Sequence, residues 1–490
     1  MDYIIVGAGP SGLTLAYLLG KSGKKCLVLD QNDSIGGCHR VKRVQGLFTE
    51  HSPRVYVSSY VNTMQWFKQM GFVFDDIYTP YKFSVGYIMN QFMGKLYLGE
   101  TLLLAQEFFK FMFQVQYDQT VTVQSFTESH GFSIASMDYL DRVCRFSDGA
   151  GSDRYSMYQF LQLINQQYFH KFYQPKLPND IGLFPRIQNA LLSTGNVTFQ
   201  LNQTIQSIGY DAVHGNVTGV TTSTQFFSGA NVILAVPPPA MSAILAASNG
   251  PIPTAFGNLS HWTPKATYNN DIAATFHWDT SLNLPLVWGF PTSEWGLISI
   301  PLTEYMNMND DRSKTVISTC ITYLDTSSSV LHLTANQITD RNILVQEMFR
   351  QLKESYPLLP APTTSLLSPT VFRNTQGWTE QDSGFFKSAQ ISFLSSKSRI
   401  SNLYQVGPQN GTSGVAFTTF EAAVTNAMVF YNTHVTSGTN HQSIRYPLEV
   451  RTVIYWVIIF LLAVLAGFLI WRYLSSKNRS TLVEHALGMN

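Results

Sequence analysis

A glycine-rich segment close to the N-terminus is the feature that most constrains the fold of this chain. A short apolar run over residues 3–6 leads into Gly7-Ala8-Gly9-Pro10-Ser11-Gly12, and a helical pattern follows over residues 13–19. A second apolar run over residues 26–29 then ends at Asp30. Strand, glycines, helix, strand and acid occur in the order of a dinucleotide-binding βαβ unit. The sequence therefore predicts a Rossmann-like domain.

Each part of this unit has a mechanical task. Gly7 allows the tight turn, Gly9 lets the backbone approach a pyrophosphate, and Gly12 permits close packing of the helix on the sheet. The N-terminus of the helix offers unpaired N–H groups and a positive dipole end to the phosphates. Asp30 stands where an acid accepts hydrogen bonds from a ribose diol. These residues predict a bound dinucleotide, but they do not separate NAD from FAD.

Two further segments narrow the choice. Gly36-Gly37 follows Asp30 by six residues and precedes Cys38-His39-Arg40. Far downstream, residues 403–407 have the pattern of a buried strand ending in Gly407, and residues 418–424 open the last helix before the C-terminal apolar run. With these motifs the chain resembles the flavin-containing amine oxidase superfamily. That superfamily includes amine oxidases, phytoene desaturases, protoporphyrinogen oxidases and, more distantly, UDP-galactopyranose mutases.

The resemblance implies non-covalent FAD, because covalent members need a cysteine near the C-terminal motif and none follows Cys320. The family's glycine pair supports the pyrophosphate and is followed directly by arginine; here Cys38 takes that place. Pro408 stands where relatives often have an acid for the ribityl chain. The cofactor-binding residues that the motifs and the resemblance together indicate are Gly7, Gly9, Gly12, Asp30, Gly36, Gly37, Arg40, Ile205 for a backbone contact to the adenine, Gly407, Glu421 and Ala422.

The predicted fold class is α/β, with the FAD-binding domain interleaved along the chain with a mixed α+β substrate domain. The segment over 80–175 is aromatic-rich and helical, whereas residues 297–300 and 316–321 have strand patterns. The expected boundaries are 1–79, 176–250 and 395–432 for the FAD-binding domain, 80–175 and 251–394 for the substrate domain, 433–451 for a linker, 452–474 for a transmembrane helix and 475–490 for a short tail.

The chemistry expected at such a site is oxidation of a small-molecule substrate. No second GxGxxG for a nicotinamide follows residue 12, so electrons would come from the substrate as hydride to flavin N5. Residues 50–56 fall where relatives pass beside the flavin ring. Arg54 can stabilise an anionic reduced flavin or bind an acidic group, and His51 can act as acid or base. The alternative is that Arg54 pairs with Glu50 or a phosphate for structure alone.

The substrate class stays open between lipophilic compounds and amines. Many amine oxidases keep a lysine in the strand that corresponds to residues 271–278, and none is present here. Phe385, Phe386 and Phe417 can supply aromatic rings over the flavin, without tyrosine hydroxyls. Classical amine oxidation is weakened, and a desaturase-like reaction on a lipophilic substrate is favoured. The alternatives are a non-redox flavin enzyme of the sugar-nucleotide mutase type and a membrane protein that has lost catalysis.

The C-terminal region predicts a membrane anchor. Residues 453–471 form nineteen consecutive positions without a charge, close to the roughly 20 needed to cross the hydrocarbon as a helix. Aromatic rings flank the run at Tyr455, Trp456, Trp471 and Tyr473, where such side chains prefer the interface. Without an N-terminal signal peptide pattern, we expect a single-pass protein with its catalytic domain in the cytosol. The slight excess of basic residues after the run favours the opposite orientation, in which the C-terminal tail faces the cytosol.

Composition bears on the remaining partners. The formal net charge is +1, so no electrostatic argument supports a nucleic-acid partner. The four cysteines are scattered without a CxxC pair, which favours a reducing compartment and predicts no metal site. The lipid bilayer and a small-molecule substrate are the expected partners.

Overall fold

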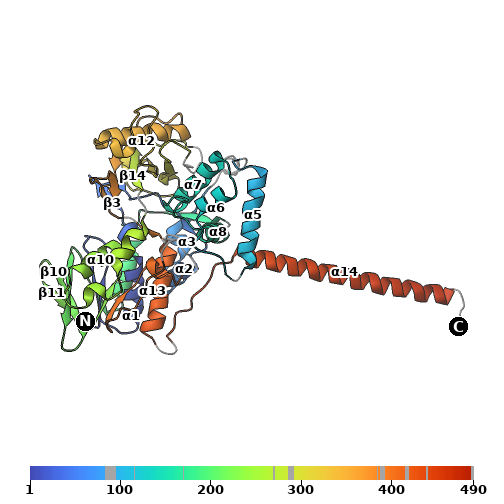
Figure 1. The fold of residues 1–490 in the computed structure, drawn as a ribbon, viewed down its shortest axis with the longest axis horizontal. Coiled ribbons are helices and arrows are strands. Elements are labelled where there is room, and N and C mark those ends of the chain that lie inside the picture. The colour runs from blue at the N-terminus through green and yellow to red at the C-terminus, as the bar shows by residue number, and fades with distance from the viewer. Residues whose placement is uncertain are drawn as a thin grey trace.

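The structure is a computed structural model of the whole chain, and it describes residues 1–82, 95–114, 116–168, 170–268, 271–284, 292–382, 384–386, 392–413, 419–436 and 440–486. A folded body carries one long helix, α14, which projects away from it (Figure 1). The body contains a parallel sheet with its helices, an antiparallel sheet, and a group of helices on the side from which α14 leaves.

A five-stranded parallel sheet forms the dinucleotide-binding part. Its order is β21-β12-β1-β2-β8, and every neighbouring pair is parallel. The strands are short and almost entirely apolar, as expected where helices cover both faces. The predicted Rossmann-like sheet is confirmed. The strands are β1 (Tyr3–Val6), β2 (Cys26–Leu29), β8 (Val197–Gln200), β12 (Asn231–Leu234) and β21 (Leu403–Gln405).

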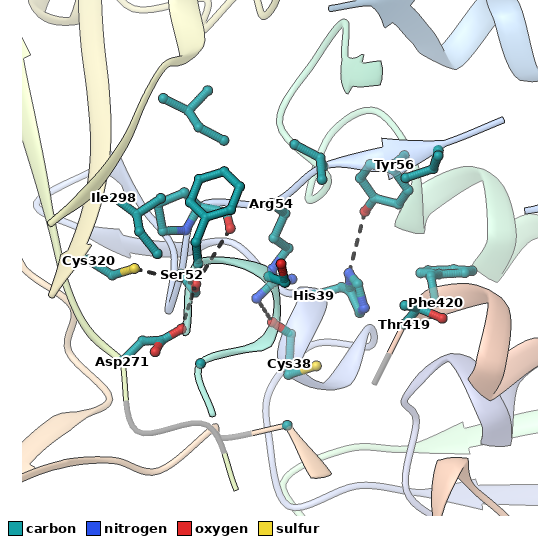
Figure 2. Close-up of a pocket in the computed structure, with 18 of the residues that line it drawn as sticks. Cys38, His39, Ser52, Arg54, Tyr56, Asp271, Ile298, Cys320, Thr419 and Phe420 are labelled. Atoms are coloured by element: carbon teal, nitrogen blue, oxygen red, sulfur yellow. Dashed lines mark hydrogen bonds between the residues drawn. The ribbon is translucent and has the colours of Figure 1, made fainter. Parts of the chain in front are cut away.

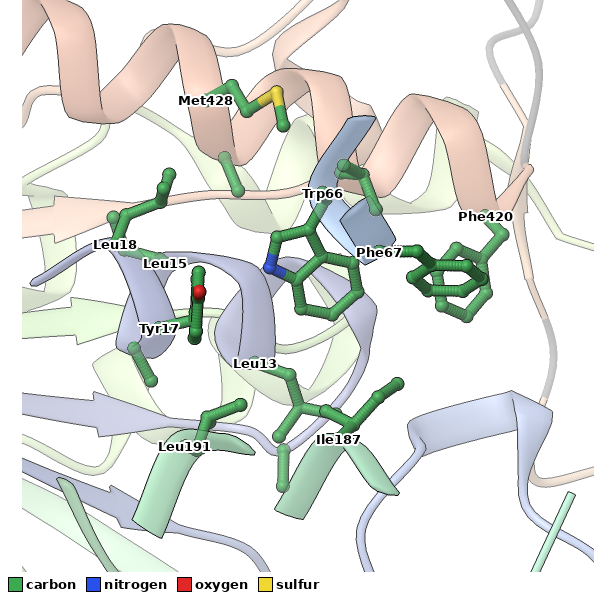
Figure 3. Close-up of a cluster of buried hydrophobic side chains, with 14 of the residues drawn as sticks. Leu13, Leu15, Tyr17, Leu18, Trp66, Phe67, Ile187, Leu191, Phe420 and Met428 are labelled. Carbon is green, nitrogen blue, oxygen red and sulfur yellow. The ribbon is translucent and has the colours of Figure 1, made fainter. Parts of the chain in front are cut away.

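Helices from distant parts of the sequence share one core against this sheet. Helix α1 (Pro10–Lys21) packs against α13 (Phe420–His434), and α2 (Val61–Gln69) and α9 (Phe184–Leu192) complete the group. Figure 3 shows Trp66 of α2 between α1 and the rings of Phe67 and Phe420. The first and last helices of the body are therefore held together, which fixes both of their N-termini beside the sheet.

A second sheet and a helical group form the rest of the body. The antiparallel sheet has the order β15-β16-β14-β17, and α12 packs its apolar face on it. The helices α5 to α8 share a core of their own. This confirms the predicted α+β part. The elements are β14 (Ile272–Trp278), β15 (Ile298–Pro301), β16 (Thr315–Ile321), β17 (Thr364–Leu367), α12 (Arg341–Ser355), α5 (Leu98–Phe113), α6 (Val123–Ser129), α7 (Ile134–Asp148) and α8 (Met157–Leu163).

Smaller elements connect these layers. A three-stranded antiparallel sheet, order β11-β10-β9, lies beside the parallel sheet, and another, order β5-β7-β6, lies near α2 and α3. Their bounds and those of the other short elements are β5 (Tyr56–Val57), β6 (Tyr78–Pro80), β7 (Phe172–Pro175), β9 (Ile205–Asp211), β10 (Asn216–Thr222), β11 (Phe226–Ser228), α3 (Phe74–Ile77), α10 (Pro238–Ala246), α11 (Leu259–Trp262), β3 (Lys42–Val44), β4 (Leu47–Thr49), β13 (Thr267–Tyr268), β18 (Val371–Arg373), β19 (Trp378–Glu380) and β20 (Phe385–Phe386).

Helix α14 (Val450–Ala486) contains the apolar run. By length and composition, Val450–Ser475 is the one stretch among the described residues that is long and apolar enough to cross a membrane, and none of its most apolar window is buried. The candidate span ends at Ser475, one residue from the predicted end, and the helix itself continues to Ala486. The segment before the helix contacts the body. The Arg445 N–H donates to Asn62 Oδ1 at 2.8 Å, which docks the segment on α2.

Candidate functional site

The two glycine segments predicted from the sequence lie against each other. Gly7 has φ +110°, and a Cβ there would lie 2.4 Å from the Ala235 carbonyl oxygen, so only glycine fits. The Gly36 N–H donates to the Ala8 carbonyl at 2.8 Å. A Cβ on Gly37 would lie 2.9 Å from the Gly9 Cα. The glycine pair therefore borders the start of α1, where the first N–H groups of the helix are available to an anion.

Asp30 and Ile205 come to the same end of the sheet. The Asp30 carboxylate is almost buried and accepts from the Ala8 N–H at 2.7 Å through Oδ2, and from the backbone and side chain of Asn32 through Oδ1. The Gln203 N–H donates to the Asp30 carbonyl at 2.8 Å, and Ile205 begins β9 two residues later. The predicted ribose and adenine positions are thus neighbours in the fold.

Arg40 carries a buried guanidinium with unused hydrogen-bonding capacity. Nε donates to the Gly37 carbonyl at 2.8 Å and Nη2 pairs with Asp382 at 3.0 Å. Nη1 is buried and has no hydrogen-bond partner within the described residues. A buried guanidinium nitrogen without a partner costs free energy. An anionic group beside Gly37 would satisfy it, so the donor set fits a pyrophosphate.

The N-terminus of α13 lies beside that of α1. Thr419 caps α13, its Oγ1 accepting from the Ala422 N–H at 3.0 Å. The Ser11 hydroxyl, in the first turn of α1, donates to the Ala423 carbonyl at 3.2 Å. Two helix N-termini, whose dipoles both favour negative charge, therefore meet near the glycine segments. Gly407 lies two residues after β21 in extended backbone, and its N–H donates to Asn410 Oδ1 at 2.9 Å.

The Glu421 side chain is directed into the fold. Its carboxylate is 1% exposed. It accepts four hydrogen bonds of 2.8 Å, from the backbone and the side chain of both Asn62 and Thr63. Burial raises its pKa, and these hydrogen bonds oppose the rise. Asn62 and Thr63 lie in the first turn of α2, so the carboxylate satisfies N–H groups that a helix start leaves unpaired.

A pocket opens next to these elements, and both predicted catalytic residues line it. Arg54 Nη2 contacts the Cys38 carbonyl (Figure 2). It also contacts His51 Nδ1, which brings the two predicted residues into direct contact. The alternative pairing of Arg54 with Glu50 is not among the ion pairs of the described residues. On the other walls lie the apolar side chains of Phe146, Leu163, Phe172, Ile298 and Ile300.

His39, Tyr56 and Phe420 form the side of the pocket nearest α13. The His39 ring meets the Phe420 ring edge-on at 5.0 Å between centroids, and Tyr56 Oη lies 3.4 Å from His39 Nδ1. Burial lowers the pKa of His39, and the Arg54 charge lowers it further. His39 is therefore a neutral hydrogen-bonding group at physiological pH. Arg54 is a cation beside it.

Asp271 is a pocket residue that the sequence motifs did not single out. Ser52 Oγ donates to Asp271 Oδ2 at 3.2 Å and lies 3.9 Å from Cys320 Sγ. Asp271 Oδ1 is buried and has no partner within the described residues. Burial raises the pKa of Asp271 to about 6, although the Ser52 hydrogen bond and the Arg145 charge lower it. Glu50 is a second buried carboxyl near Arg54, and burial raises its pKa to about 7.

The aromatic pair expected over the flavin is not described. Phe417 lies outside the described residues, as do the side chains of Phe385 and Phe386, whose backbone forms β20. Phe420 is the α13 residue that lines the pocket instead. Phe420 directly follows Thr419, the N-cap residue of α13, so its position at the start of this helix could have been recognised from the sequence.

Comparison with known proteins supports the fold. A family model described as an NAD(P)-binding Rossmann-like domain matches residues 5–70. An all-trans-retinol 13,14-reductase from Danio rerio is 50% identical over 46 residues, which is 9% of this chain and 8% of that protein. A thiamine thiazole synthase from Saccharolobus islandicus is 58% identical over 36 residues, 7% of this chain and 14% of that protein. The matches thus span a small part of these curated relatives.

Solved structures match over most of the chain. An oxidoreductase from Methanosarcina mazei superposes with a TM-score of 0.60 at 14% identity, covering 88% of this chain and 99% of that one. Putrescine oxidase gives 0.59 at 15% identity over 87% and 97%. Cyclohexylamine oxidase from Brevibacterium oxydans gives 0.60 at 14% identity over 87% and 96%. The chain has the fold of these amine oxidases. The resemblance drawn from the motifs is confirmed at the level of the fold.

Proposed function

We propose that this protein is an FAD-dependent oxidoreductase of the amine oxidase type, anchored in a membrane by α14. The observation that carries the proposal is the meeting of the α1 and α13 N-termini, joined by the Ser11–Ala423 hydrogen bond, directly beside a pocket lined by Arg54, His51 and Asp271. A site for a dinucleotide and a site for a small molecule thus share a border.

The residues present fit non-covalent FAD. The pyrophosphate would take the N–H groups at the start of α1, at the edge where Gly9 and Gly37 meet, and the free Nη1 of Arg40. Asp30 would hold the ribose hydroxyls, and the Ile205 backbone the adenine. The N-terminus of α13 would face the ring system, with Ala422 in its first turn. FAD bound in this way supplies a two-electron acceptor for hydride from the substrate.

The pocket favours a substrate with an apolar body and one cationic end. Phe146, Leu163 and Phe172 supply an apolar lining, whereas the unpaired Oδ1 of Asp271 lacks a hydrogen-bond donor. An ammonium group would satisfy that oxygen and stabilise its charge. Arg54 would then hold His39 neutral and balance negative charge near the α13 N-terminus. We therefore propose a lipophilic amine, which combines the two substrate classes left open by the sequence.

The proposed location is a membrane surface, with the catalytic body in the cytosol. Helix α14 is exposed along its apolar length and is fixed to the body at its first residue, where the Val450 N–H donates to Asn165 Oδ1 at 2.8 Å. Such a helix has no stable place in water. A bilayer-spanning α14 holds the pocket close to the lipid, from which an apolar substrate would be drawn.

Anaerobic reduction tests this proposal. Purified full-length protein is mixed without oxygen with a panel of long-chain primary amines and with neutral alcohols of the same chain length. We expect amines to bleach the visible flavin absorption and alcohols to leave it unchanged. Asp271→Asn should remove the preference, because its amide carries no charge. The mutase alternative would be favoured by two results together. The amines would fail to reduce the flavin, and the enzyme would work only in its reduced form without consuming an electron acceptor.

A further inference from the structure

Helix α5 exposes a row of large apolar side chains on the outside of the protein. Leu98 is 76% exposed, Leu102 61%, Phe109 53% and Phe113 60%. Their spacing of four, seven and four residues places them on one side of the helix. We call these four residues the α5 stripe. Phe111, on the opposite side, and Met112 are buried in the core of the helical group. The helix is therefore apolar on both faces, and the α5 stripe is left exposed without a covering partner among the described residues.

The start of α14 is fixed to the same helical group. Val450 and Ile454 pack against the cluster that contains Phe111 and Met112 of α5. Gln166 donates to Glu449 Oε1 at 2.9 Å, and Val450 is hydrogen-bonded to Asn165. The spanning helix thus leaves the body at a defined place instead of hanging from a flexible tether. The membrane surface must pass next to α5.

The direction of α5 suits that surface. In Figure 1, α5 lies at the end of the body from which α14 leaves, and it runs across the direction of α14. The candidate span Val450–Ser475 has 26 residues, about 39 Å of helix against roughly 30 Å of hydrocarbon. If α14 stands across the bilayer, α5 lies along its surface. This step rests on the proposed membrane anchoring of α14.

We propose that α5 is an in-plane membrane helix, with the α5 stripe embedded in the leaflet that α14 enters first. Helices of this kind bury their apolar face about 5–10 Å into the boundary between headgroups and acyl chains. Tyr97, 70% exposed at the N-terminal end of α5, is an aromatic residue of the type enriched at that depth. Lys110 is exposed beside the stripe, and its ammonium group suits lipid phosphates. The body would then rest on the membrane at two places and hold one orientation.

Spin-label accessibility measures the depth of α5 in the intact protein. The full-length chain is placed in phosphatidylcholine–phosphatidylserine nanodiscs, with one label at Leu102→Cys or Phe109→Cys. A label at Leu462→Cys, on the exposed apolar part of α14, gives the lipid reference, and Val213→Cys, 88% exposed in the body, gives the water reference. Cys26, Cys144 and Cys320 are buried. The unsubstituted chain, treated in parallel, gives the background from all native thiols.

We expect the Leu102 and Phe109 labels to relax several-fold faster with oxygen than with a polar nickel complex, as the Leu462 label does. The Val213 label should show the reverse. Labels at α5 that match Val213 while Leu462 matches lipid would overturn the proposal and leave the anchor standing. Labels shielded from both reagents would mean that a second protein surface covers α5, which also overturns it. A water-exposed Leu462 label would reject the spanning anchor itself.

Discussion

Replacing Glu421 by alanine distinguishes a structural role of this carboxylate from a role in holding the cofactor. The motif places Glu421 among the cofactor-binding residues, whereas in the structure it accepts four hydrogen bonds of 2.8 Å from Asn62 and Thr63. The two backbone N–H groups among these donors begin α2 and have no acceptor within their own helix. Truncation to alanine leaves them buried beside a small cavity.

The loss can be estimated from these contacts. Leaving a buried donor unpaired costs about 1–3 kcal/mol, and two backbone donors lose their partner, so we expect a loss of about 2–6 kcal/mol. For a folded body of this size, with an unfolding entropy of roughly 0.9 kcal/mol/K, that corresponds to a fall of about 2–7 °C in the unfolding midpoint. Glu421→Gln keeps the shape and one acceptor oxygen, but its NH2 group would face one of the two backbone donors, so its loss should be about half as large.

Thermal unfolding of the full-length protein in detergent, followed by tryptophan fluorescence, measures this change. Trp66 of α2 lies in the core that α2 shares with α13, so it reports on the region directly (Figure 3). The flavin affinity of the folded variant is measured separately, at a temperature below its midpoint. We expect a lower midpoint and a flavin affinity close to that of the unsubstituted protein. An unchanged midpoint with a flavin affinity at least tenfold weaker, about 1.4 kcal/mol, would refute the structural role.

Three further substitutions test the site. Arg40→Met should weaken FAD binding roughly 10–100-fold, which is the value of a charge-assisted hydrogen bond. The control Arg43→Met, on the exposed surface, should leave the affinity unchanged. If flavin fluorescence gives the two variants equal affinities for FAD, a pyrophosphate does not bind at Arg40. Gly37→Ala should abolish flavin retention because its Cβ meets the facing glycine loop, and Gly71→Ala, which has a similar backbone strain in open space, should retain it. Burial raises the pKa of Asp271 to about 6 from 3.8, so the folded state holds this proton more tightly and loses stability as pH rises between these values. Asp271→Asn should therefore be more stable than the unsubstituted protein by up to about 3 kcal/mol at pH 8. The variant should show no gain in stability near pH 3.5, and urea unfolding at both pH values measures the difference.

Local chemistry explains why much of the cofactor site was predictable. The tight turn at Gly7 and the acid at Asp30 follow from contacts within about thirty residues, and the structure places both as the motif requires. The strand and helix patterns that return to the sheet at Leu403 and Phe420 were equally clear, because parallel strands are buried on both faces and read as continuous apolar runs.

The polar part of the pocket was not predictable, because three separate segments build it. Ser52 comes from a loop, Asp271 from the start of β14, and Cys320 from the neighbouring strand β16. No spacing in the sequence links these positions, and a single acid before an apolar strand usually ends at the surface. Only the antiparallel register, with Ala273 opposite Cys320, brings them together.

Hydropathy located the candidate membrane span, but it did not predict where the helix that contains this span ends. The predicted span stops near residue 474, where charged residues resume. Those residues, including Lys477 and Arg479, are good helix formers, and neither glycine nor proline intervenes before Ala486. The limit of the apolar run indicates where the lipid would end, whereas the backbone hydrogen bonds continue beyond it.

Visible absorption of the intact, undenatured chain purified in detergent tests flavin binding most directly. We expect the visible absorption bands of an oxidised flavin, and release of the whole chromophore on denaturation, since the proposed flavin is non-covalent. Loss of the bands in Gly37→Ala, but not in Gly71→Ala, would locate the cofactor beside the two glycine segments. A colourless protein that also fails to take up added FAD would contradict the proposed function, although the fold would stand.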